Sequence, residues 1–299
     1  MAVRQLTYLA QWFVRARFFG RRTPLQTVLF VSDRCNLSCK HCSVYRHDHP
    51  QVKSYEQIGE ELAYSYRLGS RFVDFEGGEP TLWHDGAHDL NALIRLAKKI
   101  GFFSTTITTN AQQDFSDSIA DAVWVSLDGL GDYHDDIRGK GAFERLTRHI
   151  AASSHPRLSV NMVINSRNYT SVEETIRFAR SNPHIRSISL NFHTPYTGTE
   201  DLFLDWAMRS AVIDRIIDLK RSGFPVMNSV SGLRAMRRNT FKRQCWVTNF
   251  ILASGERLDT CQGQSAGVCG QCGFAMAGEM HAVFGFKPDT LLAGMNLRL

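Results

Sequence analysis

The sequence lacks any apolar run of the length, about 20 residues, that a membrane-spanning helix needs. Internal repeats and low-complexity tracts are also absent, which excludes a repeat or fibrous architecture. What remains is an ordinary globular composition, with 43% hydrophobic and 21% charged residues among 299. A chain of this size buries enough apolar surface for one large domain, alone or with a small appendage.

Acidic residues are missing from residues 1–32, although the segment is rich in arginine and the chain carries a net charge of +6. Its apolar residues fall mostly on one face of a predicted helix, which an arginine interrupts. Such a helix either caps the domain or rests on an anionic membrane surface through residues 4–22, where Trp12, Phe13 and Phe19 would meet lipid. Arginines also interrupt the apolar core that a secretory signal needs.

The cysteines do not form an even, dispersed set. All seven fall into two groups, Cys35, Cys39 and Cys42, and then Cys245, Cys261, Cys269 and Cys272. An odd number of cysteines without an export signal argues against a disulfide framework and predicts a reducing, cytoplasmic location. Clustered thiols in that setting hold metal or carry out chemistry.

Short β-branched runs alternate with helical stretches from residue 27 onward. The expected strands are 27–33, 71–80, 102–110, 121–129, 157–165 and 185–193, and the expected helices are 54–69, 89–101, 142–153, 171–182 and 205–223. This alternation predicts an α/β fold with a parallel sheet. Because a complete eight-unit barrel takes roughly 250 residues, we expect an open, partial (β/α)6 barrel. The alternation stops near residue 228, which predicts three segments: a helix at 1–24, the barrel at 25–227, and a small irregular cysteine-rich module at 228–299.

The first cysteine group has three thiols within eight residues and no fourth beside them. A structural zinc site has four ligands. His41 is unsuitable as the fourth because it directly precedes Cys42, and adjacent side chains rarely both point into one tetrahedral site. An iron–sulfur cluster accepts three thiolates more easily, because its remaining iron can bind another ligand.

Four stretches together resemble the radical S-adenosylmethionine (SAM) enzymes. CNLSCKHC (35–42) matches their Cx3Cx2C signature, and the other three are FEGGEPTL (75–82), ITTNA (107–111) and VSLDG (125–129) followed by HDDIRGKGAFE (134–144). They occur in the expected order, each at a predicted strand end, within a resemblance that covers residues 27–195.

The resemblance implies that Cys35, Cys39 and Cys42 hold three irons of a [4Fe–4S] cluster whose fourth iron binds SAM. The implied SAM contacts are Gly77, Gly78, Glu79, Asn110, Ser126, Asp128 and Arg138. Arg138 is expected on the SAM carboxylate, the glycine carbonyls on its ammonium group, and the other polar side chains on the ribose or the amino group. An electron from a donor such as flavodoxin or ferredoxin would release a 5′-deoxyadenosyl radical, which takes a hydrogen atom from the substrate.

These residues also have simpler interpretations. Gly77 and Gly78 can form a tight strand-to-helix turn. Asn110 and Ser126 can cap strand ends, and Arg138 can be a surface charge. His41, where the family often has an aromatic residue, is expected to pack near the adenine and not to bind metal.

The second cysteine group has the thiols for one metal centre and ends in a CxxC pair. Spacing alone allows zinc or iron–sulfur. The segment resembles the SPASM or shorter Twitch modules, which hold auxiliary [4Fe–4S] clusters, although five residues instead of four separate Gly255 from Cys261. We expect one auxiliary cluster with all four thiols as ligands, and zinc or a cluster with an open iron as alternatives.

A basic tract precedes this group; it comprises Arg234, Arg237, Arg238, Lys242 and Arg243. It is either a solvated helix face or a contact for an anion. Nucleic acid is not expected, because interleaved aromatic residues and a nucleic-acid-binding motif are missing.

The resemblance therefore predicts an oxidoreductase or maturase acting on a peptide or protein, a sugar-derived alcohol or a tetrapyrrole. Asn191, His193 and Tyr196 follow the last predicted strand and face the expected cavity, but no catalytic acid or base is assigned. A lipid-like substrate met at the inner face of the membrane is an alternative, since an arginine-rich helix also resembles the enzymes of hopanoid assembly. A zinc-stapled binding protein without turnover is the alternative from another class.

Overall fold

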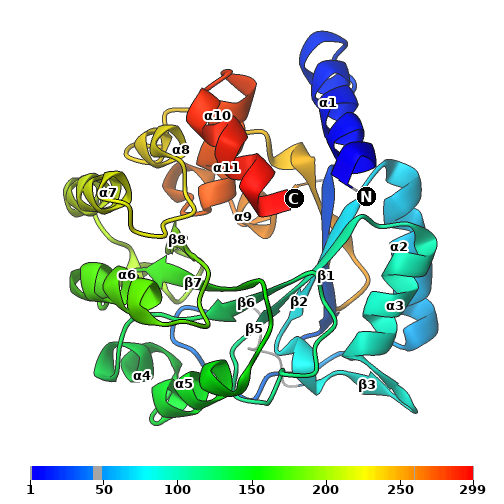
Figure 1. Ribbon diagram of the computed structural model, residues 1–299, viewed down its shortest axis with the longest axis horizontal. Helices are drawn as coiled ribbons and strands as arrows, with labels where there is room; N and C mark the ends of the chain where they lie inside the picture. The colour runs from blue at the N-terminus through cyan, green and yellow to red at the C-terminus, as the bar shows by residue number, and fades with distance from the viewer. Residues whose placement is uncertain (1, 43–48, 259, 299) are drawn as a thin grey trace.

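The computed structural model describes residues 2–42, 49–258 and 260–298, and it has an α/β fold (Figure 1). Among these residues the main sheet has eight strands in the order β10-β9-β1-β2-β5-β6-β7-β8, and every neighbouring pair except β10 and β9 is parallel. The strands of the predicted barrel are β1 (Gln26–Ser32), β2 (Phe72–Gly77), β5 (Ser104–Thr109), β6 (Ala122–Ser126), β7 (Leu158–Ile164) and β8 (Ile188–Phe192). A small hairpin pairs β3 (His84–Asp85) with β4 (His88–Asp89). This sheet confirms the predicted α/β partial barrel.

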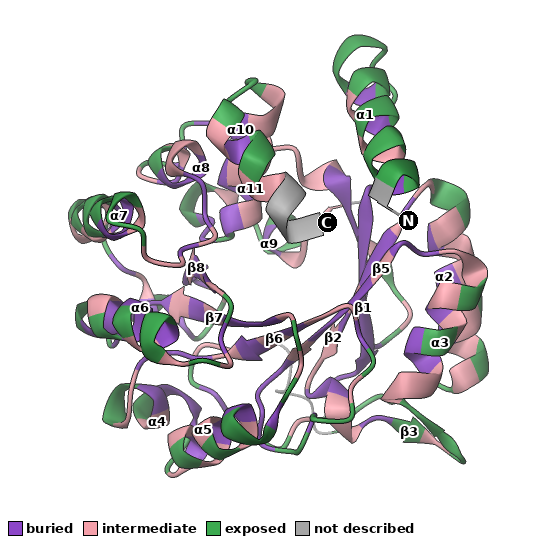
Figure 2. Ribbon diagram, viewed as in Figure 1, coloured by how far each residue is buried: buried purple, intermediate pink, exposed green. Residues whose placement is uncertain are grey.

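The helices between these strands follow one another around the outside of the curved sheet (Figure 1). They are α2 (Tyr55–Leu68), α3 (Leu90–Ile100), α4 (Asp132–Arg138), α5 (Ala142–Ala152), α6 (Val172–Ser181) and α7 (Trp206–Arg221). The sequence signals for α2 are confirmed, because Ser54 accepts the amide hydrogen of Gln57 and Gly69 ends the helix with a left-handed φ of 116°. The strands lie buried between these helices and the interior (Figure 2), as expected for a parallel sheet.

The C-terminal segment is more regular than the sequence predicts. It contains α8 (Val230–Ala235), β9 (Thr248–Ile251), β10 (Arg257–Leu258), α9 (Gln262–Ser265), α10 (Ala275–Phe284) and α11 (Pro288–Arg298). β9 pairs in parallel with β1 and so extends the barrel sheet across residue 228. A four-residue strand gives little sequence signal, but it satisfies the backbone of β1, which would otherwise be an exposed edge. The division into three segments stays a prediction.

The same segment also docks on β8, at the other edge of the open barrel. The Phe192 amide donates to the Gly273 carbonyl at 2.9 Å, and the Asn191 side chain accepts from the Ala275 amide at 2.7 Å. A Cβ on Gly273 would lie 1.8 Å from the Phe192 carbonyl oxygen, so this approach requires glycine. Helices α8, α10 and α11 thereby span the gap between α7 and α1 (Figure 1).

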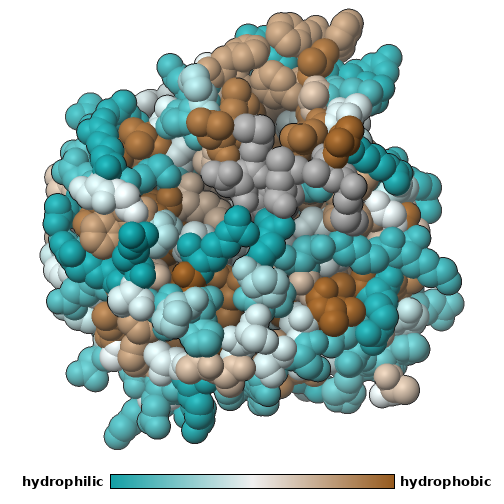
Figure 3. All heavy atoms as spheres, in the orientation of Figure 1, coloured by the Kyte–Doolittle hydropathy of each residue, from teal (hydrophilic) through white to brown (hydrophobic). Residues whose placement is uncertain are grey.

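Helix α1 (Ala2–Phe18) packs on the domain through part of its apolar face. Trp12 contacts Trp246, and Phe13 contacts Phe284, with ring centroids 5.7 and 5.5 Å apart. These two side chains are therefore engaged within the protein and are not free to meet lipid. Apolar side chains remain exposed at the far end of α1, where Phe18 and Phe19 are 62% and 71% exposed. Figure 3 shows apolar surface at the top of the molecule. Within the described residues, no helix is long and apolar enough to span a membrane.

Candidate metal and cofactor sites

One cavity lies where β1, β2, β5 and β6 end, because the carboxyl ends of parallel strands share one edge of the sheet. The cavity brings together all three cysteines of the first group and all but one of the SAM contacts that the resemblance implies. Its lining includes Cys35, Cys39, Cys42, Gly77, Gly78, Glu79, Asn110, Ser126 and Arg138. Asp128 is the exception and lies behind the wall.

Gly77 and Gly78 let the turn after β2 lie directly on the start of the cysteine loop. The Gly78 amide donates to the Ser32 carbonyl at 2.7 Å, and the Glu79 amide donates to the Arg34 carbonyl at 2.8 Å. A Cβ on Gly77 would lie 2.0 Å from the first carbonyl oxygen, and one on Gly78 would lie 2.1 Å from the second. Glycine is thus required here by the packing of two backbone segments, in addition to any contact with a ligand.

Glu79 fastens the same turn to the end of β5. Its carboxylate accepts hydrogen bonds from the Thr81 hydroxyl, the Thr109 hydroxyl and the Asn110 amide, each at 2.7 Å. The side chain is buried, which raises the pKa of the carboxyl group, although the donors oppose this shift. Four donors to one carboxylate, with the Thr81 amide as the fourth, hold the cavity wall in a fixed shape.

Asn110 connects this wall to the cysteine loop. Its amide nitrogen donates to the Asn36 side chain at 2.8 Å and lies 3.7 Å from the Cys35 sulfur. Its side-chain oxygen accepts from the Gln112 amide at 2.9 Å. The strand-end capping and the contact with the cysteine loop therefore occur together in one residue.

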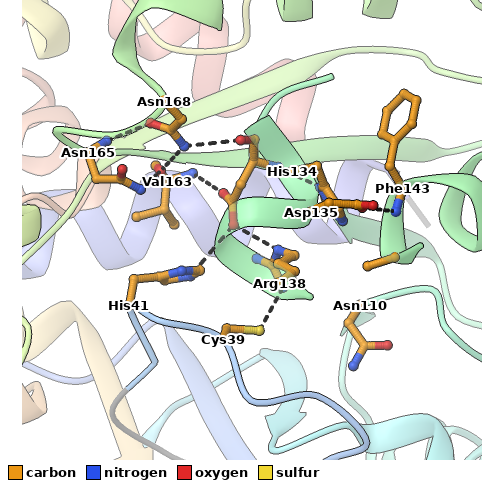
Figure 4. Close-up of polar contacts among 12 residues, drawn as sticks. Cys39, His41, Asn110, His134, Asp135, Arg138, Phe143, Val163, Asn165 and Asn168 are labelled. Atoms are coloured by element: carbon orange, nitrogen blue, oxygen red, sulfur yellow. Dashed lines mark hydrogen bonds and ion pairs between the residues drawn. The ribbon is translucent and has the colours of Figure 1, made fainter. Parts of the chain in front are cut away.

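Arg138 reaches the cavity from the end of α4, where it lies beside Cys39 (Figure 4). Asp128 holds it there. The Arg138 Nε donates to the Asp128 carboxylate at 2.7 Å, and the other carboxylate oxygen accepts from the Val163 amide at 2.9 Å. Burial alone would lower the pKa of Arg138, but the carboxylate and neighbouring thiols together raise it. Asp128 is fully buried, so in this arrangement it positions Arg138 and does not face the cavity.

The thiols of the first group suit a metal centre that displaces their protons. Burial raises the pKa of Cys39 to about 12 and also raises the pKa of Cys35, so neither is a thiolate at neutral pH on its own. Metal ions bind cysteine as thiolate and supply the charge that keeps it deprotonated. Arg138 adds a second positive charge, with its Nη1 at 3.9 Å from the Cys39 sulfur. Three thiols and one guanidinium on one cavity fit a three-thiolate iron–sulfur cluster.

His41 lines the same cavity as the cysteines and is partly buried. Its Nε2 is 3.7 Å from the Asp128 carboxylate, and its ring lies edge-on to His193 with centroids 6.4 Å apart. Burial lowers the pKa of His41 to about 4, so the ring is neutral at pH 7. The Nε2 atom of His193 lies 3.0 Å from both the carbonyl oxygen and the hydroxyl of Thr199, within hydrogen-bond distance of each.

Glu76 and Thr108 also line the cavity. Both fall within the stretches FEGGEPTL and ITTNA, but the sequence analysis did not include either among the SAM contacts. The Thr108 hydroxyl donates to the Glu76 carboxylate at 3.3 Å. Burial raises the pKa of Glu76 to about 7, with the Asp74 charge adding to the shift. The signal that could have found Glu76 is its two-residue spacing from Asp74, which puts both carboxylates on the inner face of β2.

The four cysteines of the second group gather between β8 and β9. The interaction between the neighbouring Cys245 and Cys261 thiols raises the pKa of Cys245 and lowers the pKa of Cys261. Tyr196 lies beside this group. Burial is the main cause that raises the pKa of its hydroxyl, and the charges of Cys261, Cys272 and Cys269 add to the shift. Four thiols that share one electrostatic environment fit a metal centre with four thiolates.

The spacing of the thiols bears on the kind of metal. Within the described ranges, no three His, Cys, Asp or Glu side chains form a group that could hold a single metal ion. Zinc binds thiolates at about 2.3 Å, so its four ligands must converge on one point. Thiolates of an iron–sulfur cluster bind separate irons and so lie farther apart than the ligands of one zinc ion.

The basic tract has two parts. Arg234, Arg237 and Arg238 line an open cavity of about 340 Å³ together with His281, and Arg237 pairs with Asp214. Arg243 instead turns inward and donates to the Cys269 carbonyl. Lys242 is exposed and lies outside this cavity lining.

Comparison with known proteins agrees with this geometry. The family model described as the Radical SAM superfamily matches residues 29–179. The Fe-coproporphyrin III synthase of Methanosarcina barkeri is 26% identical over 218 residues, which cover 65% of this chain and 52% of that protein. The chain thus spans about half the length of this curated relative.

Two solved structures share the fold. Streptococcus suis SuiB bound to S-adenosylmethionine has a TM-score of 0.65 and 18% identity, covering 86% of this chain and 65% of that one. The structure of anSMEcpe with bound AdoMet and Cp18Cys peptide has a TM-score of 0.58 and 15% identity, covering 92% of this chain and 83% of that one. At these identities the likeness concerns the fold alone.

Proposed function

Because the chain belongs to the radical SAM superfamily, we propose that it is an oxidoreductase or maturase with a SAM-binding [4Fe–4S] cluster on Cys35, Cys39 and Cys42. We further propose an auxiliary [4Fe–4S] cluster on Cys245, Cys261, Cys269 and Cys272, in a SPASM- or Twitch-like module. The observation that carries the proposal is the single cavity on which three thiols meet Arg138 and the turn after β2.

When bound, the first cluster with SAM supplies a 5′-deoxyadenosyl radical that takes a hydrogen atom from the substrate, and the second accepts an electron from the substrate radical. The protein supplies binding and orientation. Arg138, fixed by Asp128, provides the cation for the SAM carboxylate. Asn110 and Ser126 offer polar contacts on the cavity wall, while Glu79 keeps the wall in place. The electron source in this proposal is a small donor protein such as flavodoxin or ferredoxin.

The substrate classes in this proposal are a tetrapyrrole, a peptide or protein, and a sugar-derived alcohol. The name of the Methanosarcina barkeri relative supports the tetrapyrrole, and the peptide bound to anSMEcpe supports the peptide. With an auxiliary cluster to take the second electron, the net reaction is a two-electron oxidation or a cross-link.

Metal analysis after anaerobic reconstitution tests both centres. We expect about eight irons per chain in the wild type and about four in the Cys35→Ala, Cys39→Ala, Cys42→Ala variant. The same loss is expected when the four C-terminal cysteines are replaced instead. Colourless protein with about two zinc ions and no iron would establish the zinc-stapled alternative.

Product analysis tests the reaction. Reconstituted wild type with reductant and SAM should release 5′-deoxyadenosine, and Arg138→Met should lower the yield by weakening SAM binding while keeping its iron. Arg148→Met, an exposed arginine on α5, is the matched control and should behave as the wild type. A wild type that holds all its iron yet never forms 5′-deoxyadenosine with reductant and substrate candidates would refute the proposal.

A second candidate function is action on a lipid-like substrate at a membrane surface. The observation in its favour is the exposed end of α1, where Phe18 and Phe19 are 62% and 71% exposed and the exposed Arg21 and Arg22 follow. This end combines apolar rings with positive charge, as peripheral membrane segments do.

Flotation with anionic and neutral vesicles tests this candidate. We expect the wild type to float with anionic vesicles and the Phe18→Ser, Phe19→Ser variant to remain in solution. Phe274→Ser, which removes a 42% exposed ring elsewhere, should float as the wild type does. Equal partitioning of all three proteins would remove the candidate.

A further inference from the structure

Arg209, on α7, is fully buried although no carboxylate pairs with it among the described residues. Its Nη2 donates to the Cys272 carbonyl at 2.9 Å and lies 3.4 Å from the Asn239 side-chain oxygen. Its Nε and Nη1 are buried without a hydrogen-bond partner in the part of the chain that the structure describes. A buried guanidinium with two free nitrogens is unusual and costly, because it gives up its hydration without a counter-charge.

The neighbours of Arg209 reduce this cost only in part. Its guanidinium carbon lies 4.5 Å from the ring centroid of Phe192 and 5.0 Å from that of Trp206. Aromatic faces attract a cation but carry no net charge. The guanidinium of arginine stays protonated in proteins. At neutral pH the side chain therefore remains positive and lacks a full negative partner.

The missing negative charge has a natural source in the second cysteine group. Four thiolates around an iron–sulfur core give a centre with net negative charge, and reduction adds one more electron. Arg209 already bonds the backbone of Cys272, one of the four expected ligands. In this water-poor setting a fixed positive charge acts on the centre with little screening.

We propose that Arg209 is the counter-charge of the second metal centre and raises its reduction potential. The inference rests on the proposed function, because it requires that the C-terminal cysteines hold a cluster. Arg209 contacts the backbone of Cys272, an expected ligand residue, and no substrate, so its effect on the reduction potential is indirect. Nothing in the sequence pattern singles out Arg209, which is one of several arginines within a long predicted helix.

A redox titration followed by electron paramagnetic resonance tests the proposal. The Cys35→Ala, Cys39→Ala, Cys42→Ala protein isolates the second centre. At the midpoint potential of this parent, Arg209→Met should lower the ratio of reduced to oxidised cluster at least tenfold, which corresponds to about 59 mV for one electron. Arg209→Lys keeps the charge and should stay close to the parent. Arg215→Met is the matched control, because Arg215 lies on the same helix but is exposed and pairs with Glu173.

The outcomes separate the two proposals. A parent protein without iron would refute the auxiliary cluster itself. A fully loaded Arg209→Met protein with the parent's potential would overturn the role of Arg209 and leave the cluster intact. Should Arg209→Met not fold, Arg209→Gln replaces it, since its amide can still donate to the Cys272 carbonyl. Failure of both neutral variants to fold without iron, when Arg209→Lys folds, would assign Arg209 a purely structural role and overturn the proposal.

Discussion

Asp128 illustrates how one buried carboxylate organises the first site. It binds Arg138 and the Val163 amide through its side chain, and the Asn168 side chain through its carbonyl. We expect Asp128→Ala to lower the free energy of unfolding by about 3–5 kcal/mol, because it leaves the Arg138 guanidinium buried without its partner. Asp136→Ala, which breaks an exposed pair with Lys40, should cost less than about 1 kcal/mol.

Urea unfolding of the two iron-free variants and the wild type, followed by circular dichroism, measures both effects. Equal losses in the two variants would contradict the assignment of Asp128 as the anchor of Arg138.

Glu279 predicts a pH dependence of stability. It is half-buried on α10 and accepts from the Ser229 hydroxyl at 2.6 Å, and burial raises the pKa of its carboxyl group from 4.5 to about 7. Between pH 4.5 and 7 the unfolded chain releases this proton while the folded protein keeps it, so rising pH favours unfolding. The wild type should therefore lose up to about 3 kcal/mol across this window relative to Glu279→Gln, and nothing further above it.

Unfolding of both iron-free proteins in urea at several pH values measures this difference. A difference between them that does not change with pH would show that the carboxyl group titrates normally.

At the residue scale, the sequence predicts which residues line the first cavity. It does not predict which neighbouring side chains fix them in position. The cysteines, Asn110 and Arg138 were found because their motifs follow strand ends. The engagement of Asp128 with Arg138 and the isolation of Arg209 depend on partners brought together by the fold. A sequence pattern contains no information on whether a given arginine finds a carboxylate.

At the scale of elements, the turn after β2 depends on glycine for its contact with the cysteine loop. A Cβ on Gly78 would lie 2.1 Å from the Arg34 carbonyl oxygen and 2.6 Å from that of Asp33. We expect Gly78→Ala to displace the loop and to reduce bound iron from about eight to about four per chain, with the second centre unaffected. Gly86→Asn is the control, since Gly86 has open space around it and a φ of 56° that asparagine tolerates.

Iron analysis of the reconstituted variants measures the outcome. Full iron content in Gly78→Ala would mean that the loop accommodates the methyl group and that the glycine serves another purpose.

Prediction of elements succeeded where local signals were complete. α2 has a serine cap, an apolar face and a terminal glycine, and all three lie within its own sequence. β9 has four residues beside a cysteine and a glycine turn, so its pairing with β1 is decided by an edge more than 200 residues away in the chain. Short strands of this kind are fixed by tertiary context and not by their own composition.

At the scale of the whole molecule, the C-terminal segment joins both edges of the open barrel. If the C-terminal cysteines hold the proposed second metal centre, its loss in a Cys245→Ala, Cys261→Ala variant should loosen this junction. Hydrogen exchange of residues 245–275 should accelerate at least about tenfold, while β5 and β6 keep their protection. The control is the reconstituted Cys35→Ala, Cys39→Ala, Cys42→Ala variant, which should retain slow exchange in this segment. Equal acceleration throughout the barrel would contradict a local role for the centre.

The barrel's class could be predicted from the sequence because every strand–helix unit repeats the same pattern. The way the C-terminal segment bridges the two edges of the barrel could not be predicted. The contacts of Gly273 with Phe192 and of β9 with β1 join residues far apart in the chain, and no sequence motif marks them.

Strand β1 leads directly into the first cysteine loop and shares its backbone ladder with β9, which begins three residues after Cys245. Cys35 and Cys245 therefore lie beyond opposite ends of this strand pair, and β1 separates them. A molecule that contacted Cys35 and Cys245 at once would have to reach from one end of β1 to the other.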